Sequence, residues 1–268
     1  MAAGPARGLQ LTLGRYAAIT VVKPCEGPPP HSLTEHVRVP IRQGPPSATA
    51  TGRTSLYAPR DVLSTLAAIL GFRDRTYRRR AVDALRLTGG DTVVEIGCGT
   101  GRNFRLLQDL VGPTGRLIAI DVSSALLARA QRRVDRHGWL NVELVHSDAT
   151  AYEFPEQIDG ALATYSLVAI PDYDRVVQAA FGALKEGHRC AVLDQTLPSG
   201  LASRLVPIVN WLSGPIPYRA LVGERQVWVS MERYFGKVAI QEFYFGFVYL
   251  ATGEKPQEAP SRPLPNER

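Results

Sequence analysis

The sequence has few of the residues that build disulfide frameworks or metal centres, and it has no long apolar run. Its 268 residues include three cysteines, at the widely separated positions Cys25, Cys98 and Cys190. An odd number of scattered cysteines fits neither a disulfide framework nor paired metal ligands, and it is typical of a reducing, cytoplasmic setting. No stretch of 18 consecutive apolar residues occurs, which predicts that no helix spans a membrane.

Histidine is also scarce, with five residues in the chain. His137, His146 and His188 share no spacing typical of metal ligands, so the sequence predicts no metal site. The N-terminal residues lack the apolar core and small-residue cleavage pattern of a secretion signal, and we expect none.

Basic residues exceed acidic ones, giving a formal net charge of +6 and a pI near 9.4. This balance favours anionic partners such as a nucleotide-like cofactor, acidic lipid headgroups or nucleic acid, without choosing among them. A dense cluster comprises Arg73, Arg75, Arg78, Arg79 and Arg80. A looser set comprises Arg129, Arg132, Arg133 and Arg136. We interpret the looser set as a solvated helix face, whereas the dense cluster fits a solvated face and an anionic headgroup site equally.

Composition divides the chain into a leader, a folded domain and a tail. Residues 1–52 are rich in proline, glycine, serine and threonine and poor in apolar side chains, which predicts a disordered leader. A single domain is expected over residues 53–254, beginning with helices over 60–88. The proline-rich residues 255–268 are expected to form a flexible tail.

Short apolar strands alternate with amphipathic helices over residues 91–195. The strands are predicted at 92–96, 116–120, 142–146, 160–165 and 190–194, and the helices near 102–110, 123–137 and 172–185. This alternation predicts an α/β, Rossmann-like, doubly wound and mostly parallel sheet of about seven strands. The apolar runs around Gly246 predict a C-terminal antiparallel hairpin over 237–253. Residues 196–236 form an insertion between these parts, whose apolar side chains fit core packing and a lid-like role equally.

A glycine-rich loop follows the first predicted strand and opens a helix. Gly97, Gly99 and Gly101 provide a sharp turn and a backbone that a ligand can approach closely. A dinucleotide site has the pattern G-x-G-x-x-G, which binds a pyrophosphate. Here the third glycine comes one residue early, so a ligand without a pyrophosphate fits the loop better.

Acidic residues stand at the ends of three successive predicted strands. Glu95 ends the first, Asp121 follows the second and Asp148 follows the third. The carboxyl ends of parallel strands meet at one edge of a sheet, where ligands of this fold bind. A carboxylate such as Asp121 can accept two hydrogen bonds from ribose hydroxyls. The three strand ends together predict a nucleoside-binding site.

The segments V-V-E-I-G-C-G-T-G, I-A-I-D and H-S-D-A resemble the successive cofactor motifs of the class I S-adenosylmethionine-dependent methyltransferases. The resemblance covers about residues 73–253 and is closest to the ubiquinone/menaquinone-biosynthesis and bacterial phospholipid N-methyltransferase branch. It implies that S-adenosyl-L-methionine is the cofactor, with its methionine part against the glycine loop, its ribose on Asp121 and its adenine beside Asp148. The implied cofactor-binding residues are Glu95, Gly97, Cys98, Gly99, Gly101, Asp121, Val122, Asp148, Ala149 and Tyr165.

The resemblance implies methyl transfer to a small-molecule or lipid-like acceptor, apolar and carrying an amine or a quinone ring. No pair of histidine and carboxylate identifies a general base, so no catalytic residue is assigned. The apolar segment 201–218 suggests peripheral contact with a membrane. Nucleic acid is not expected as a substrate, because no Asn/Asp-Pro-Pro-aromatic motif follows the fourth strand. An NAD(P)-dependent oxidoreductase and a non-catalytic Rossmann-like binding module are the alternatives.

Overall fold

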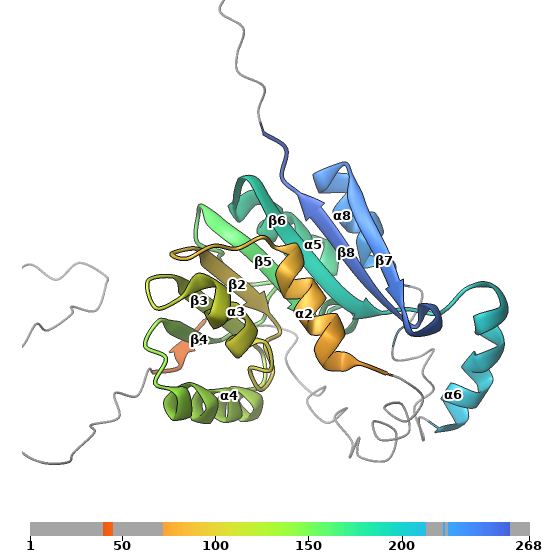
Figure 1. The fold of residues 1–268 in the computed structure, drawn as a ribbon, viewed down its shortest axis with the longest axis horizontal. Coiled ribbons are helices and arrows are strands. Elements are labelled where there is room, and N and C mark those ends of the chain that lie inside the picture. Colours follow the sequence, from red (N-terminus) through yellow and green to blue (C-terminus); the bar gives the residue numbers. More distant parts are fainter. Residues whose placement is uncertain (1–39, 45–71, 213–221, 223–224, 258–268) are drawn as a thin grey trace, which may run out of the picture. The chain divides into compact units, whose positions relative to one another are not determined.

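The computed structural model describes residues 40–44, 72–212, 222 and 225–257, all of which belong to one unit, His36–Arg268. Their strands form an eight-stranded sheet in the order β1-β4-β3-β2-β5-β6-β8-β7 (Figure 1). The strands are β1 (Arg42–Gln43), β2 (Thr92–Ile96), β3 (Arg116–Asp121), β4 (Val142–His146), β5 (Ile158–Thr164), β6 (Leu184–Gln195), β7 (Val238–Phe243) and β8 (Val248–Glu254). The predicted α/β sheet is confirmed.

The middle of the sheet is parallel, as the alternating pattern predicts. β4, β3, β2, β5 and β6 pair with one another in this order, and each of these pairs is parallel. Helices α3 (Phe104–Val111), α4 (Ser124–His137) and α5 (Tyr173–Ala183) provide three of the crossovers. All seven residues of β5 are buried, because helices cover both faces of this part of the sheet.

Each face of the sheet has its own apolar core. Helix α2 (Asp74–Ala84) joins α3 and α4 on one face, where Tyr77, Phe104 and Leu127 pack with Val93. Helices α5 and α8 (Val227–Phe235) cover the other face (Figure 1). Neighbouring residues of one strand point to opposite faces, so Val94 belongs to the second core.

The leader contributes an edge strand that the sequence analysis did not predict. β1 pairs in parallel with β4, and Arg42 Nη1 lies 3.0 Å from Glu143 Oε1. Disorder was therefore the wrong expectation for Arg42–Gln43, and the sheet has eight strands instead of seven. This strand is two residues long, and it is held by backbone pairing and by the packing of Ile41 against the core. So short a strand produces no alternating hydrophobic pattern by which it could be predicted in a proline-rich sequence. Residues 1–39 and 45–52 of the leader lie outside the described residues.

The predicted C-terminal hairpin is confirmed. β7 and β8 pair antiparallel through the short 3₁₀ turn η4 (Tyr244–Gly246), in which Gly246 has a φ of +81°. Order continues past the predicted end of the domain, since the Lys255 N–H donates to the carbonyl of His188 at 2.8 Å. The expectation that the flexible tail begins at residue 255 was therefore wrong for Lys255.

The insertion over 196–236 contains the 3₁₀ helix η3 (Gly200–Leu205), α6 (Val206–Leu212) and α8. A short 3₁₀ turn, η2 (Leu167–Ala169), lies earlier in the chain, after β5. Met231 of α8 is fully buried in the core, so a lid-like role does not extend to this helix. Two predictions fall on residues outside the described ranges: the first part of the helices predicted over 60–88, near 60–70, and residues 213–218 of the apolar segment 201–218. No helix within the described ranges is both long and apolar enough to cross a membrane.

Leu162→Ala tests the central position of β5. Its side chain is fully buried, so truncation leaves a cavity, and we expect the free energy of unfolding to fall by about 3 kcal/mol. Leu140→Ala removes the same atoms from a side chain that is 73% exposed, and it should change this free energy by less than about 0.5 kcal/mol. Urea unfolding of both variants provides the measurement, and equal effects would contradict the assigned burial.

Candidate functional site

The predicted site residues lie along one edge of the sheet. β4, β3, β2 and β5 are adjacent and parallel, so their carboxyl ends meet there. The loops after them are joined by hydrogen bonds: Cys98 N donates to Ile120 O at 2.9 Å, Ser147 N to Asp121 O at 3.1 Å, and Ser166 Oγ to Ile96 O at 2.7 Å. The structure thus brings the glycine loop, both aspartate loops and the Tyr165 loop together.

The three glycines of the loop have different roles. All have positive φ, of +68° at Gly97, +57° at Gly99 and +71° at Gly101. A Cβ on Gly97 would lie 2.4 Å from Ser166 Cβ, and one on Gly101 would lie 2.5 Å from Phe104 Cε2. A Cβ on Gly99 would have no neighbour within 4 Å. Two glycines therefore permit close packing, and Gly99 presents bare backbone to open space.

Cys98 is a packing residue. Its side chain is 5% exposed and belongs to the core beneath α2, α3 and α4. Burial raises the pKa of the Cys98 thiol well above its ordinary value, so the thiol stays protonated. Its burial and its protonated state both disfavour a nucleophilic role.

Asp121 fixes the glycine loop to the end of β3. Its Oδ2 accepts a hydrogen bond from the Gly99 N–H at 2.7 Å, and its Oδ1 accepts one from the Ser123 N–H at 2.8 Å. Burial raises the pKa of Asp121, and these two bonds oppose that rise. Because each carboxylate oxygen can accept a second bond, ribose binding stays a prediction for Asp121.

The loop after β4 carries the residues predicted to lie beside adenine. Asp148 Oδ1 accepts from the backbone N–H and the hydroxyl of Thr150, at 2.9 and 2.8 Å, which fixes the turn. Ala149 is 8% exposed. Val122, 45% exposed, is an apolar side chain on the neighbouring loop, and its carbonyl lies 3.1 Å from His146 Nε2.

Glu95 is a buried carboxylate with one oxygen unused. It is 1% exposed, and its Oε1 accepts a hydrogen bond from Asn103 Nδ2 at 2.7 Å. Its Oε2 is buried and has no partner among the described residues. Burial raises the pKa of Glu95 to about 7. An unsatisfied oxygen of this kind, in a predicted ligand site, is suited to a cationic or N–H donor from a ligand.

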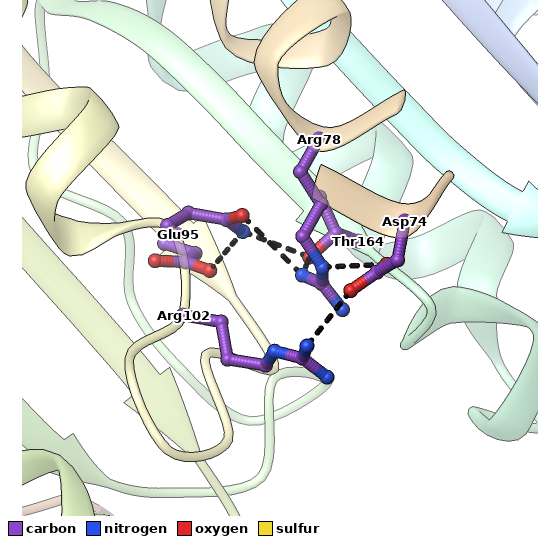
Figure 2. A network of polar contacts seen from close by, with 6 residues as sticks. Asp74, Arg78, Glu95, Arg102 and Thr164 are labelled. Atoms are coloured by element: carbon purple, nitrogen blue, oxygen red, sulfur yellow. Dashed lines mark hydrogen bonds and ion pairs between the residues drawn. The ribbon is translucent and has the colours of Figure 1, made fainter. Parts of the chain in front are cut away.

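A polar network connects Glu95 to helix α2 (Figure 2). Asn103 Nδ2 also donates to Thr164 Oγ1 at 2.9 Å, and Arg78 Nη1 donates to the same oxygen at 2.7 Å. Arg78 is in turn held by Asp74, with 2.9 Å between Nε and Oδ1. Sequence reasoning missed Asn103 and Thr164, because nothing in the sequence shows that these two polar side chains are buried. A signal for Asn103 was its place two residues after Gly101, where a ligand-binding loop enters its helix.

Tyr165 holds a strained position directly after β5. Its φ is +56°, a conformation that costs free energy for a residue with a Cβ and that concentrates at functional sites. Its hydroxyl is buried without a partner among the described residues, and the Arg78 guanidinium lies 4.9 Å from its ring centroid. Burial raises the pKa of Tyr165 well above its ordinary value, so the phenol stays neutral and can donate a hydrogen bond.

Asp194 is a second buried carboxylate, and sequence reasoning did not single it out. It is fully buried at the end of β6 and accepts hydrogen bonds from the Val168 and Gln195 N–H groups, each at 2.9 Å. Burial raises its pKa to about 7. These bonds hold the segment that follows Tyr165, which makes Asp194 a positioning residue for that loop.

A comparison with known protein families matches residues 93–187 to a family described as "Methyltransferase domain". The matched segment contains the glycine loop, Asp121, Asp148 and Tyr165. Residues 93–187 thus match a methyltransferase domain. The interpretation made from the cofactor motifs is thereby confirmed, and it is favoured over the oxidoreductase alternative.

Curated relatives of the methyltransferase domain include quinone methyltransferases. The chain is 35% identical over 136 residues to the 2-phytyl-1,4-naphtoquinone methyltransferase of Thermosynechococcus vestitus, covering 50% of this chain and 59% of that protein. It is 27% identical over 124 residues to the demethylmenaquinone methyltransferase of Listeria welshimeri, covering 46% of this chain and 52% of that protein. The aligned region thus spans somewhat more than half of each relative.

A solved structure shares the fold of the methyltransferase domain. The SAM-dependent methyltransferase of Aquifex aeolicus superposes with a TM-score of 0.51 at 17% identity, covering 70% of this chain and 96% of that one. No cluster of three or more potential metal ligands occurs within the described residues.

Glu95→Gln tests the buried carboxylate. Its pKa rises on folding from 4.5 to about 7, so between these values the folded protein binds more protons than the unfolded chain, and its stability falls as the pH rises. The glutamine does not titrate and keeps an acceptor for Asn103. We expect the free energy of unfolding of the variant, relative to the native protein, to increase by about 2–3 kcal/mol from about pH 5 to about pH 8.

Urea unfolding across this pH range provides the measurement. The difference between the two proteins is the informative quantity, because Asp194, whose pKa is also about 7, contributes to both curves. A difference that does not change with pH would show that Glu95 is ionised in the folded state at pH 5.

Proposed function

We propose that the chain binds S-adenosylmethionine at the edge formed by β4, β3, β2 and β5 and transfers its methyl group to an apolar, quinone-type acceptor. The observation that carries the proposal is the unpaired buried oxygen of Glu95 at the end of β2, four residues before the open backbone of Gly99. When bound, the cofactor supplies an electrophilic methyl group on a sulfonium. The residues of the chain bind and orient it and exclude water.

The donor set fits an adenosyl amino acid. Glu95 Oε2 provides an acceptor for an ammonium group, and the free lone pairs of Asp121 provide acceptors for ribose hydroxyls. Val122 and Ala149 provide apolar surface beside an adenine ring, with Asp148 as a polar neighbour. Gly97, Cys98 and Gly101 shape the loop from within, and Gly99 provides its contact surface.

A pyrophosphate fits this loop less well. The third glycine, Gly101, comes one residue earlier than in the G-x-G-x-x-G pattern of a pyrophosphate site. Glu95 would place a carboxylate close to the phosphates, which is electrostatically unfavourable. Both features disfavour the dinucleotide required by an NAD(P)-dependent oxidoreductase.

The acceptor is proposed from the relatives and from the site together. Both curated relatives are named for methylating naphthoquinone-type compounds, which are apolar. Tyr165 provides a neutral hydroxyl that can donate to a ring oxygen of a reduced quinone. Transfer from an already activated methyl group needs mainly positioning and desolvation. In favourable systems these lower the activation free energy by up to roughly 7–11 kcal/mol.

The apolar side chains of η3 and α6 suit such an acceptor. Leu201 is 79% exposed, Ile208 55% and Leu205 39%, a density of exposed apolar residues that fits contact with a lipid tail or with a membrane surface. We propose peripheral membrane contact through this segment, as expected for a chain that acts on a membrane-dissolved quinone.

Asp121→Asn tests the cofactor site. The amide keeps one acceptor for the loop but loses the charge and the second acceptor, so we expect the affinity for S-adenosylmethionine to fall roughly 10- to 100-fold. Isothermal titration calorimetry gives the affinity. Asp83→Asn, the same change at an exposed position on α2, is the matched control and should bind like the native protein. Unchanged affinity in Asp121→Asn would remove the ribose assignment.

Tyr165→Phe tests the acceptor site in an assay that follows labelled methyl groups from S-adenosylmethionine to a reduced, prenylated naphthoquinone. We expect kcat/KM to fall roughly tenfold, the value of one lost hydrogen bond. The free energy of unfolding should stay unchanged or rise, because the hydroxyl has no partner among the described residues. Tyr249→Phe removes another buried hydroxyl for which the described part of the chain provides no partner, from the core strand β8, and should leave kcat/KM unchanged.

The same assay with phosphatidylethanolamine separates the competing functions. Label in the amine lipid but not in the quinone would replace the acceptor proposed here. Binding of S-adenosylmethionine without transfer to either acceptor would support the non-catalytic alternative and contradict methyl transfer.

A further inference from the structure

A hollow of about 590 Å³ lies outside the cofactor site and is lined mainly by arginines. We call it the arginine groove. Its charged lining residues are Asp74, Arg75, Arg78, Arg79, Arg102, Arg105, Asp109 and Arg133, and Leu106 completes it. None of the predicted cofactor-binding residues is among them. The groove is therefore distinct from the proposed cofactor site.

Positive charge in the groove is largely uncompensated. Six arginines face two aspartates, a formal excess of four positive charges. Asp74 already pairs with both Arg78 and Arg102, at 2.9 and 3.0 Å (Figure 2). Within the described part of the chain, the side chains of Arg75, Arg79, Arg105 and Arg133 form no ion pair. Keeping these like charges together is unfavourable unless an anion joins them.

The groove differs from an ordinary solvated helix face. Its arginines come from α2, from the loop and helix after the glycines, and from α4, so three separate parts of the chain converge on one concave surface. Arg129, Arg132 and Arg136 lie on α4 and are exposed, but they do not line the groove. A concave surface of one charge sign focuses the electrostatic potential and concentrates anions.

The chemistry of the lining selects phosphate groups. Guanidinium groups present forked N–H donors that match phosphate oxygens, and they stay charged at all relevant pH values. The volume lies within the range of about 300–1,000 Å³ typical of small-molecule sites. A single phosphate would leave most of the arginines unused, which favours a ligand with two phosphate groups or a surface of many.

We propose that the arginine groove binds phosphate or diphosphate groups, carried either by a soluble ligand or by the headgroups of anionic lipids. Arg78 belongs to the groove and also donates to Thr164 beside Glu95. A ligand in the groove thus contacts an arginine that supports the methyltransferase site, and the site and the groove share one side chain.

The test measures binding of pyrophosphate to the full chain by calorimetry, without S-adenosylmethionine or acceptor. The groove variant is Arg75→Gln with Arg105→Gln, two exposed arginines from different helices. The control is Arg132→Gln with Arg136→Gln, which makes the same change in net charge outside the groove. We expect the groove variant to lose roughly tenfold or more in affinity and the control to bind like the native protein.

Co-sedimentation with vesicles distinguishes the two sources of phosphate. The vesicles contain phosphatidylcholine with or without phosphatidylglycerol. Sedimentation that needs phosphatidylglycerol and is lost in the groove variant supports a lipid headgroup, whereas pyrophosphate binding without sedimentation supports a soluble ligand.

Equal losses in the groove variant and the control would show that only net charge matters, and would overturn the proposal. Absence of binding to both probes would overturn it as well. Far-UV circular dichroism and the melting temperature establish that both variants are folded. Cofactor binding and methyl transfer are measured separately, so a failure here leaves the proposed function intact.

Discussion

The hydrogen bond from Asn103 to Glu95 is the interaction on which the rest of the site depends. It places a carboxylate in the interior of the sheet, at the end of a central strand, and satisfies one of its two oxygens. A fully buried carboxylate is costly without partners, and the raised pKa of Glu95 reflects that cost. The second oxygen has no partner among the described residues, and in the proposed function it accepts from the ammonium group of the cofactor.

The polar network around this bond extends the same constraint to the first helix of the described domain. Thr164 accepts hydrogen bonds from Asn103 and from Arg78, which connects β5, the helix after the glycine loop and α2. Asp194 fixes the next loop in the same way, through backbone N–H groups. Tyr165 lies between these two anchored segments, which explains how the chain maintains a non-glycine residue at a φ of +56°.

The domain thus holds charged side chains in two different environments. At the sheet edge, single carboxylates are buried and hydrogen-bonded, as suits the ordered binding of a small polar cofactor. In the arginine groove, four of the six arginines form no ion pair within the described chain, as suits a phosphate-rich ligand. Arg78 takes part in both.

Periodicity and glycine placement by themselves determined the α/β class, the parallel centre of the sheet, the hairpin and the identity of the motif residues. These features are local: strand Thr92–Ile96 is mostly apolar, and Gly97 to Gly101 follow it directly. Only the tertiary structure decided which of the three loop glycines faces open space, that Asn103 and Thr164 join the polar network, and that Arg42–Gln43 adds an edge strand. Each depends on contacts between residues distant in sequence, such as the 61 positions between Asn103 and Thr164. No local pattern encodes such contacts, because burial and pairing arise only when the strands assemble.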